Sequence, residues 1–290
     1  MTFGSMYFDK KKAETRGKDK NEYIPRSCEI IAIKDLTNDV RHFKVKFKDG
    51  KDFDYLPGQF VQVSIFGVGE APISITSSKL AGDELELAIR RVGILTNAIH
   101  KLKAGDEIFI RGPYGNSFDY KAAQGKNIVF VAGGIGLVPL RSLIRTMLHE
   151  KEKYGPITLL YGARCPGDCV YVDEVEKWMK IEGFDALLTV DSPDDGWGGN
   201  VGVVTTLFEK FDFKPEETVG FLCGPPIMIK FVNLTLTQKG MDPGDIVTTM
   251  EMHMKCGLGK CGHCNIGHKY CCTDGPVFTY AELKKLDVEE

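Results

Sequence analysis

Polar and apolar residues alternate along the first 120 residues in a pattern that predicts β-strands. Alternation or β-branched enrichment marks the runs 29–34, 42–48, 60–65, 83–90 and 107–111. Turn signals with a glycine separate them at 48–50, 56–58, 81–83 and 104–106. Several short strands at this spacing predict a closed antiparallel β-barrel. Within this region only residues 96–103 have a helical pattern.

The pattern changes after Gly125. Residues 126–132 form a continuous apolar run, which is typical of a strand buried on both faces. Further strand-like runs follow at 157–161, 185–190 and 218–223, and helical patterns occupy 137–151, 173–181, 205–211 and 227–239. Strands that alternate with helices predict a doubly wound parallel sheet.

The two ends of the chain differ from both regions. The first 24 residues are rich in lysine and acidic residues and poor in apolar ones, which predicts a flexible, solvated extension. From residue 248 the chain is rich in cysteine and glycine and too small to fold without a metal or another staple. The predicted fold class is therefore β plus α/β, with limits at 1–24, 25–120, 121–247 and 248–290.

Composition narrows the function classes. The 290 residues carry a formal net charge of -3, whereas a nucleic-acid-binding protein is usually basic. No apolar run approaches the roughly 20 residues that cross a bilayer, and the N-terminal residues lack the apolar core of a secretory signal. We therefore expect a cytoplasmic protein with no membrane span and no nucleic-acid partner.

Five of the nine cysteines are crowded between Cys256 and Cys272. A disulfide scaffold would be short, secreted and evenly cross-linked, so this crowding indicates a metal site. Cys256, Cys261 and Cys264 have the C-x4-C-x2-C spacing of plant-type 2Fe–2S proteins, which require one later cysteine. The glycines 257, 259 and 262 permit backbone N–H groups to approach the sulfur atoms.

Two other chemistries fit these cysteines less well. Structural zinc sites usually contain two C-x-x-C pairs, and this segment has one. A redox disulfide between Cys261 and Cys264 would leave Cys256 unexplained. The spacing does not choose between Cys271 and Cys272 as the fourth ligand. The neighbouring histidines 253, 263 and 268 are interpreted as surface residues or as residues that surround the cluster.

A glycine-rich turn follows the apolar strand 126–132. Gly133, Gly134 and Gly136 stand between a strand and a helix, where glycines let the backbone approach a dinucleotide pyrophosphate. A tight turn with no ligand is the alternative. Cys223, Gly224 and Pro225 end a second strand of the same sheet. Because ligands bind at the carboxyl ends of such strands, this turn is predicted to lie beside Gly134.

Two further signals are less specific. Cys223 is either a small buried residue or a contact to a nicotinamide, and we take it as the catalytic candidate. Arg90, Gly93 and Thr96 combine a cation, a glycine and a hydroxyl at the start of a helix, which suits a phosphate. A solvated strand edge is the alternative for this segment.

Taken in order, these motifs resemble the ferredoxin-reductase-like flavoproteins, and more closely their electron-transfer subunits with a C-terminal 2Fe–2S cluster. The resemblance extends over about residues 25–285. It is carried by residues 57–60 (PGQF), 71–75 (APISI), 93–96 (GILT), 111–115 (RGPYG), 133–136 (GGIG), 161–164 (YGAR), 223–226 (CGPP) and the terminal cysteines.

The resemblance implies cofactors and their contacts. FAD would lie on the barrel, with Pro72, Ile73, Ser74 and Ile75 along its isoalloxazine and ribityl chain. Gly93, Leu95 and Thr96 would meet its pyrophosphate. NAD(H) or NADP(H) would lie across the Gly134 and Cys223 turns. Cys272 is the implied fourth cluster ligand, because residues 272–278 (CTDGPVF) match those that follow it in related proteins.

The chain departs from the wider family at two places. Ala71 stands where an arginine usually precedes the flavin motif, and Arg90 or Arg91 is a candidate to replace its phosphate contact. Many simple reductases end in an aromatic residue that stacks on the flavin, whereas this chain continues into the cysteine-rich segment. The residue that covers the flavin is therefore not assigned from the sequence.

The resemblance implies a diaphorase subunit that moves electrons between NAD(P)(H), FAD and a 2Fe–2S cluster. Its partners would be the catalytic and iron–sulfur subunits of a larger, hydrogenase-like redox complex. A stand-alone reductase of a soluble acceptor and a zinc-stabilised assembly protein are the rival readings. No acidic residue follows the strand at Tyr161, where an acid would favour NAD, and Arg164 is either a contact to a 2′-phosphate or an ordinary surface residue in an ion pair.

Overall fold

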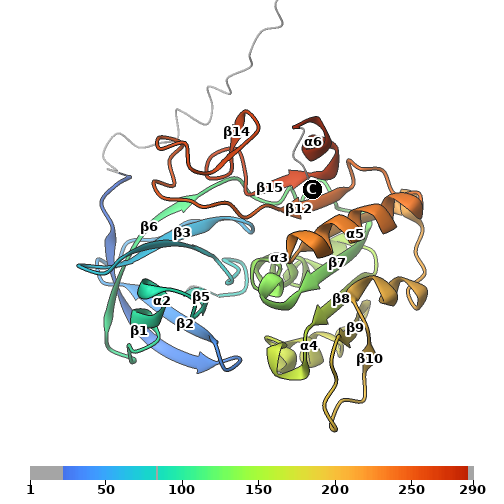
Figure 1. Ribbon diagram of the computed structural model, residues 1–290, viewed down its shortest axis with the longest axis horizontal. Coiled ribbons are helices and arrows are strands. Elements are labelled where there is room, and N and C mark those ends of the chain that lie inside the picture. The colour runs from blue at the N-terminus through green and yellow to red at the C-terminus, as the bar shows by residue number, and fades with distance from the viewer. Residues whose placement is uncertain (1–21, 83, 287–290) are drawn as a thin grey trace, which may run out of the picture.

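The computed structural model describes residues 22–82 and 84–286. Almost all of the predicted extension, residues 1–21, lies outside the described residues. The described chain forms two sheets with separate cores, and the cysteine-rich segment lies against both of them (Figure 1).

The first sheet is an antiparallel barrel of six strands. In spatial order these are β4 (Gly69–Ser74), β3 (Phe60–Ile65), β6 (Glu107–Tyr114), β1 (Arg26–Asp35), β2 (Val40–Phe47) and β5 (Leu85–Arg90). A single bridge between Ile75 and Leu87 closes the ends of the sheet. Alternate residues such as Val61 and Val63 fill the interior, and the short helix α2 (Ile94–Ile99) packs beside it. The predicted barrel is confirmed.

The second sheet has seven strands. Their order is β10 (Asn200–Val201), β9 (Phe184–Val190), β8 (Ile157–Ala163), β7 (Asn127–Gly133), β11 (Thr218–Cys223), β12 (Ile246–Thr249) and β15 (Val277–Thr279). All neighbours are parallel except β12 and β15. The chain runs outward from β7 to β10 and then returns to β11 on the other side of β7. Ligands bind at such a reversal in strand order.

Both faces of the second sheet are covered, which explains why β7 is apolar throughout. Phe130 and Ala132 contact the layer that contains α3 (Leu137–His149) and α4 (Val172–Trp178). Val129 and Val131 contact the layer of α5 (Pro226–Gln238) and the 3-10 helix η4 (Val204–Glu209). The predicted doubly wound arrangement is confirmed.

The cysteine-rich segment leaves the second sheet at β12 and rejoins it at β15. Between them it forms the small hairpin of β13 (Asn265–Ile266) and β14 (Lys269–Tyr270), and helix α6 (Tyr280–Lys285) follows β15. Phe60 and Tyr114 of the barrel share a core with Cys264 and Phe278. The segment is therefore anchored at both ends in the sheet and packs on the barrel. The limit at residues 247/248 stays a prediction.

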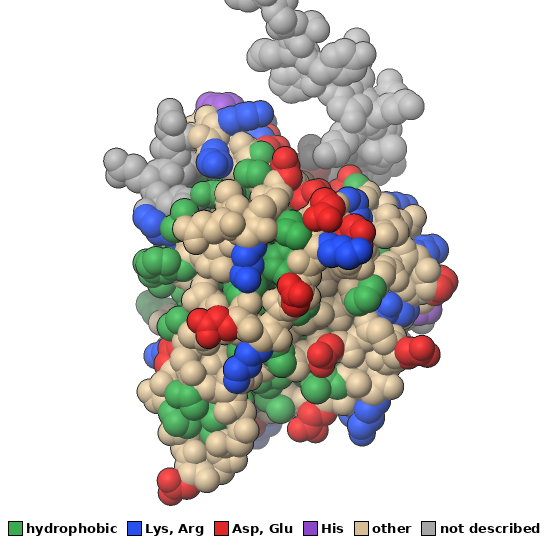
Figure 2. Space-filling model, turned by 90° about the vertical axis from the view of Figure 1, so that its right-hand side faces the viewer, with side chains coloured by type: hydrophobic (Ala, Val, Ile, Leu, Met, Phe, Trp, Pro, Cys, Tyr) green, Lys and Arg blue, Asp and Glu red, His purple; other side chains and the backbone are tan. Residues whose placement is uncertain are grey.

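Local differences from the predictions have simple causes. Residues 205–211 are predicted to be helical, and the helix there is the 3-10 helix η4, two residues shorter at its C-terminal end. The sequence pattern does not predict strand β4, which lacks an alternation of its own and contains Pro72. The proline is tolerated because β4 pairs with β3 on one side only, apart from the closing bridge. No helix among the described residues is long and apolar enough to cross a membrane. The face in Figure 2 mixes acidic and basic side chains without a field of one sign.

Candidate cofactor sites

A cleft of about 160 Å³ lies where the barrel, the second sheet and the cysteine-rich segment meet. Its barrel wall contains Phe60 from β3 and Pro72 and Ser74 from β4, and Pro139 of α3 lines it from the second sheet. The remaining wall is made by residues from Thr249 to Met254 and by Pro276. A group bound here would touch all three parts of the molecule.

Strand alternation divides the four residues of the predicted flavin motif between two environments. Pro72 and Ser74 line the cleft, whereas Ile73 and Ile75 belong to the barrel core. Ile75 is almost completely buried, so its backbone is the part able to meet a ligand. The cleft is thus bordered by one face of β4.

The residues predicted for the flavin phosphates lie at the start of α2. The Thr96 hydroxyl accepts hydrogen bonds from the backbone N–H groups of Val92 and Gly93, each at 2.9 Å. Leu95 is buried, while Ile94 is 82% exposed. Arg90 Nε lies 3.1 Å from Asp39 Oδ2, so its charge is balanced within the barrel. These residues form an ordered turn, with an exposed apolar side chain beside it.

The chain from Thr249 onward contributes a further wall of the cleft. Thr249, Met250, Glu251, Met252 and Met254 line it together with Pro72 and Ser74. Thr249 ends β12, whose run Ile246–Thr249 is rich in β-branched residues. That run is the sequence signal for a further strand, but the predicted limit at residues 247/248 divides it and assigns its end to the cysteine-rich segment.

The glycine turn and the Cys223 turn meet at the carboxyl edge of the second sheet. Ala132 of β7 is in register with Cys223 of β11. A methyl group on Gly136 would overlap the Cys223 carbonyl, so the two turns pack backbone to backbone. Gly134 has a φ of +54°, and a Cβ there would meet nothing within 4 Å. This open, N–H-lined turn fits a pyrophosphate.

Cys223 lies inside this edge. Burial raises the pKa of its thiol to about 12, and the neighbouring Thr249 hydroxyl offsets this only in part. The thiol therefore stays protonated at neutral pH and is not an activated nucleophile. Its contact with Thr249 connects the nucleotide edge to the wall of the cleft, which suits a group that positions a ring rather than one that attacks it.

Arg164 follows β8 at the same edge of the sheet. Its side chain is 78% exposed, and Nε lies 2.9 Å from Asp168 Oδ2. The hydroxyl of Tyr161 donates to the Gly134 carbonyl at 3.1 Å and accepts from the backbone N–H of Val170 at 2.8 Å. Tyr161 therefore holds the glycine turn against the loop that follows Arg164.

The predicted cluster loop is organised by backbone N–H groups that point at sulfur. Cys256 Sγ accepts from Leu258 at 3.4 Å and from Lys260 at 3.3 Å, and Cys272 Sγ accepts from Gly259 at 3.1 Å. The glycines 257, 259 and 262 all have φ near +70°. A side chain on Gly257 would press on the Tyr114 ring at 3.1 Å. Iron–sulfur sites use such N–H···S hydrogen bonds to tune their potential.

The four thiols of the predicted cluster loop interact with one another. Cys261 interacts with Cys256, and Cys272 interacts with both Cys264 and Cys256. All nine cysteines are free of disulfides.

The two adjacent cysteines point in different directions. Cys271 is buried and its thiol donates to the Met250 carbonyl at 3.0 Å, away from the loop. Cys272 faces Gly259 and Cys264 within the loop. The orientation agrees with the choice of Cys272 that the resemblance implied.

A buried amide lies between the cleft and the cluster loop. Gln62 of β3 is 1% exposed, and neither its nitrogen nor its oxygen has a hydrogen-bond partner among residues 22–82 and 84–286. It is in register with Pro72, and its Cγ approaches the position of a Cβ on Gly257 at 3.6 Å. Because orphaned buried amides are rare, this position fits a polar group supplied by a cofactor.

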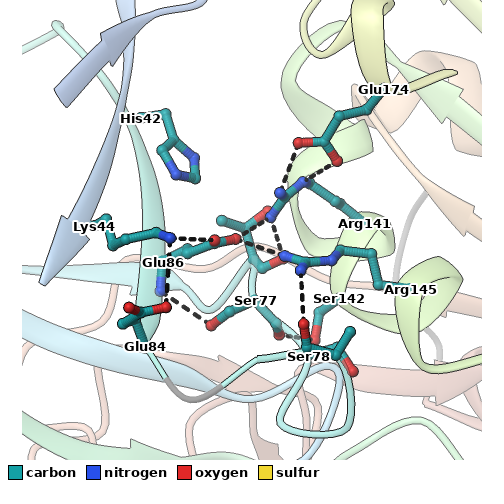
Figure 3. A network of polar contacts seen from close by, with 12 residues as sticks. His42, Lys44, Ser77, Ser78, Glu84, Glu86, Arg141, Ser142, Arg145 and Glu174 are labelled. Carbon is teal, nitrogen blue, oxygen red and sulfur yellow. Dashed lines mark hydrogen bonds and ion pairs between the residues drawn. The ribbon is translucent and has the colours of Figure 1, made fainter. Parts of the chain in front are cut away.

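A network of buried charges joins the barrel to the second sheet (Figure 3). Arg141 of α3 donates to Glu86 of β5 at 2.6 Å and to Glu174 of α4 at 2.7 and 2.8 Å. Arg145 also donates to Glu86, at 2.7 Å. Burial opposes the ionisation of Glu86, but the two arginines outweigh it and lower its pKa. The network was not predicted, since its members are isolated charges in the sequence.

Three families match successive parts of the chain. Residues 27–120 match the oxidoreductase FAD-binding domain, and residues 130–233 match the oxidoreductase NAD-binding domain. Residues 251–284 match the iron–sulfur cluster binding domain of dihydroorotate dehydrogenase B.

Relatives match along most of their length. Sulfhydrogenase 2 subunit gamma of Pyrococcus furiosus is 41% identical over 279 residues, which cover 90% of this chain and 96% of the relative. A probable dihydroorotate dehydrogenase B electron transfer subunit of Thermococcus kodakarensis is 33% identical, with 90% and 99% covered. A chain from the structure of NADH-dependent reduced ferredoxin-NADP oxidoreductase superposes with a TM-score of 0.70 at 27% identity, and 89% of this chain and 90% of that chain are covered.

Proposed function

The chain belongs to the family of FAD- and NAD-binding electron-transfer subunits with a C-terminal iron–sulfur domain, and from this we propose that it passes electrons between NAD(P)(H) and the redox subunits of a larger complex. The observation that supports this most directly is the cleft where Pro72 and Ser74 of the barrel, Pro139 of α3 and the 249–254 segment converge. Its relatives are subunits of sulfhydrogenase and dihydroorotate dehydrogenase B, so we propose a hydrogenase-like partner.

When bound, the nicotinamide and flavin supply hydride chemistry and the cluster accepts single electrons. The protein contributes position. Gly133, Gly134 and Gly136 would hold the nucleotide pyrophosphate, while Cys223, Gly224 and Pro225 would place the nicotinamide at the cleft. Both turns are held by direct backbone packing, so the site is rigid before a ligand enters.

The flavin would lie between β4 and the 249–254 segment. Pro72 and Ser74 form one wall, backed by the backbone at Ile73 and Ile75. Arg90, Gly93, Leu95 and Thr96 would meet its phosphates. Met250, Met252 and Met254 would line its other side, and the chain continues from Met254 directly into the predicted cluster loop. This short covalent path supports a flavin site close to Cys256.

We propose Cys256, Cys261, Cys264 and Cys272 as ligands of a 2Fe–2S cluster. The mutual interaction of these thiols and the N–H groups around two of the sulfurs support this. The domain limits that follow are 25–120 for FAD, 121–247 for NAD(P) and 248–290 for the cluster.

The test is an anaerobic absorption and EPR spectrum of the full chain, titrated with NADH and then NADPH. We expect flavin bands and 2Fe–2S absorbance, both bleached by one of the two nucleotides. Cys272→Ser is expected to lose the cluster signal, and the adjacent Cys271→Ser is the matched control that keeps it. The ligand assignment would be contradicted by a wild-type protein that contains flavin but no cluster, or by loss of the cluster signal in Cys271→Ser alone.

A further inference from the structure

One barrel side chain reaches into the predicted cluster loop from β6. Arg111 is 7% exposed and makes five hydrogen bonds. Two of them form a bidentate pair with Glu70 of β4, with Nε 2.6 Å from Oε1. Strands β4 and β6, which flank β3 in the barrel, therefore supply the two partners of an ion pair in which the arginine is buried and the carboxylate is partly exposed.

Of the remaining three bonds, one goes to Tyr114 at the end of β6 and two leave the barrel. Arg111 Nη1 donates to the Cys256 carbonyl at 2.6 Å and to the Tyr114 hydroxyl at 3.1 Å, and Nη2 donates to the Lys255 carbonyl at 3.3 Å. A guanidinium has five N–H donors, so none is left over. Its orientation is fixed, with the charge held against the backbone of the first proposed cluster ligand.

The guanidinium contacts the cluster loop directly, and its counter-charge does not. Arg111 donates to two carbonyls of the loop, whereas no hydrogen bond or ion pair joins Glu70 to residues 255–264. In the sequence, the stretch 252–273 contains lysines and histidines, and the nearest acidic residues are Glu251 and Asp274 at its two ends. Arg111 is therefore the charge that touches the loop from the barrel side, and its burial limits solvent screening.

We propose that Arg111, held by Glu70, is a positioning residue that raises the reduction potential of the cluster. This rests on the proposed function, because it concerns the cluster bound by Cys256 and its partners. One-electron reduction adds one negative charge to the cluster, and no bond or proton at Arg111 changes. A fixed cation nearby stabilises the reduced form, and net charge is one of the factors that set iron–sulfur potentials.

A purely mechanical role for Arg111 makes a different prediction. If the pair only fastened the loop to the barrel, breaking it from either side would loosen the same contact and move the potential in the same direction. An electrostatic role predicts opposite signs. Arg111→Gln removes the cation and leaves Glu70, whereas Glu70→Gln removes the anion and leaves the cation.

The experiment is an EPR-monitored redox titration of the cluster in the purified full-length holoprotein. We expect Arg111→Gln to lower the equilibrium constant for one-electron reduction about tenfold, which is ~59 mV. Glu70→Gln is expected to raise the potential, and Arg111→Lys, which keeps the charge, to shift it less than half as far as Arg111→Gln. Arg41→Gln is the matched control. It breaks the Arg41–Asp35 pair between β2 and β1 and is expected to leave the reduction potential unchanged.

Shifts of the same sign in Arg111→Gln and Glu70→Gln, or an unshifted potential in Glu70→Gln, would overturn the inference. If Arg111→Gln fails to fold, the Glu70→Gln and Arg111→Lys variants still decide it. A wild-type protein without any cluster signal would instead overturn the proposed function itself, and the two failures are distinguishable in one spectrum.

Discussion

Replacing Arg141 by methionine tests whether the buried charge network of Figure 3 holds the barrel to the second sheet. Arg141 is 4% exposed and connects α3 to Glu86 of the barrel and to Glu174 of α4. It also donates to the Thr76 carbonyl at 2.9 Å, and its guanidinium lies 4.6 Å from the centre of the Tyr171 ring. Methionine retains most of the volume and removes the charge and all these donors.

The magnitude follows from what is left unpaired. Removing one partner of a buried ion pair typically costs 3–5 kcal/mol, because the other charge remains buried. Glu86 keeps Arg145 at 2.7 Å, and Glu174 is partly exposed to water. We therefore expect the free energy of unfolding to fall by about 3 kcal/mol, at the lower end of that range.

The assay uses the positions of the two tryptophans. Trp178 ends helix α4 and Trp197 lies in the loop between β9 and β10, so their fluorescence reports on the second sheet and its covering layers, while far-UV circular dichroism reports on both parts. In urea unfolding of the wild-type protein the two transitions are expected to coincide. In Arg141→Met they are expected to separate, because the barrel and the sheet lose their main polar connection.

Arg164→Met is the matched control. It breaks a pair whose arginine is 78% exposed, and such pairs contribute at most about 1 kcal/mol. The reasoning is refuted if Arg141→Met unfolds within about 1 kcal/mol of the wild type with coincident transitions. It is also refuted if Arg164→Met has the larger effect.

Three further predictions follow from single sites. Burial lowers the pKa of His42 to about 4, below its ordinary 6.5, so the unfolded chain takes up this proton first. Stability is complete above pH 6.5 and falls by up to about 3 kcal/mol towards pH 4, and His42→Gln is expected to lose this pH dependence in thermal unfolding. Gly136→Ala places a methyl group against the Cys223 carbonyl and is expected to weaken NAD(P)H binding at least tenfold, measured by fluorescence titration. The control Gly167→Ala adds its methyl group in open space and is expected to leave the affinity unchanged. Equal affinities of the two variants would contradict the packing of the two turns. Gln62→Met removes an amide that has no hydrogen-bond partner among the described residues and is expected to stabilise the cofactor-free protein by about 1–3 kcal/mol. Thermal unfolding measures this gain, and an unchanged or lower melting temperature would contradict it.

Local sequence patterns were sufficient to predict the strands and helices whose apolar residues recur regularly. They also predicted the motifs that are defined by the spacing of their residues. The apolar run of β7, the glycine turn after it and the cysteine spacing each lie within about a dozen residues. Such segments carry their own signal, because backbone conformation and ligand reach are decided by near neighbours along the chain. The closed barrel and the doubly wound sheet follow from the order of these segments.

Tertiary structure alone decided which distant residues meet. Strand β4 has no strand period, and it pairs because β3 offers an edge on which Pro72 is tolerated. The 249–254 segment covers the cleft only because β12 extends the second sheet and aims the chain at the barrel. Arg111 meets the Cys256 carbonyl across 145 positions of sequence, and Arg141 meets Glu86 across 55. These contacts depend on how separately folded parts pack together, and no periodicity or spacing in the sequence records that geometry.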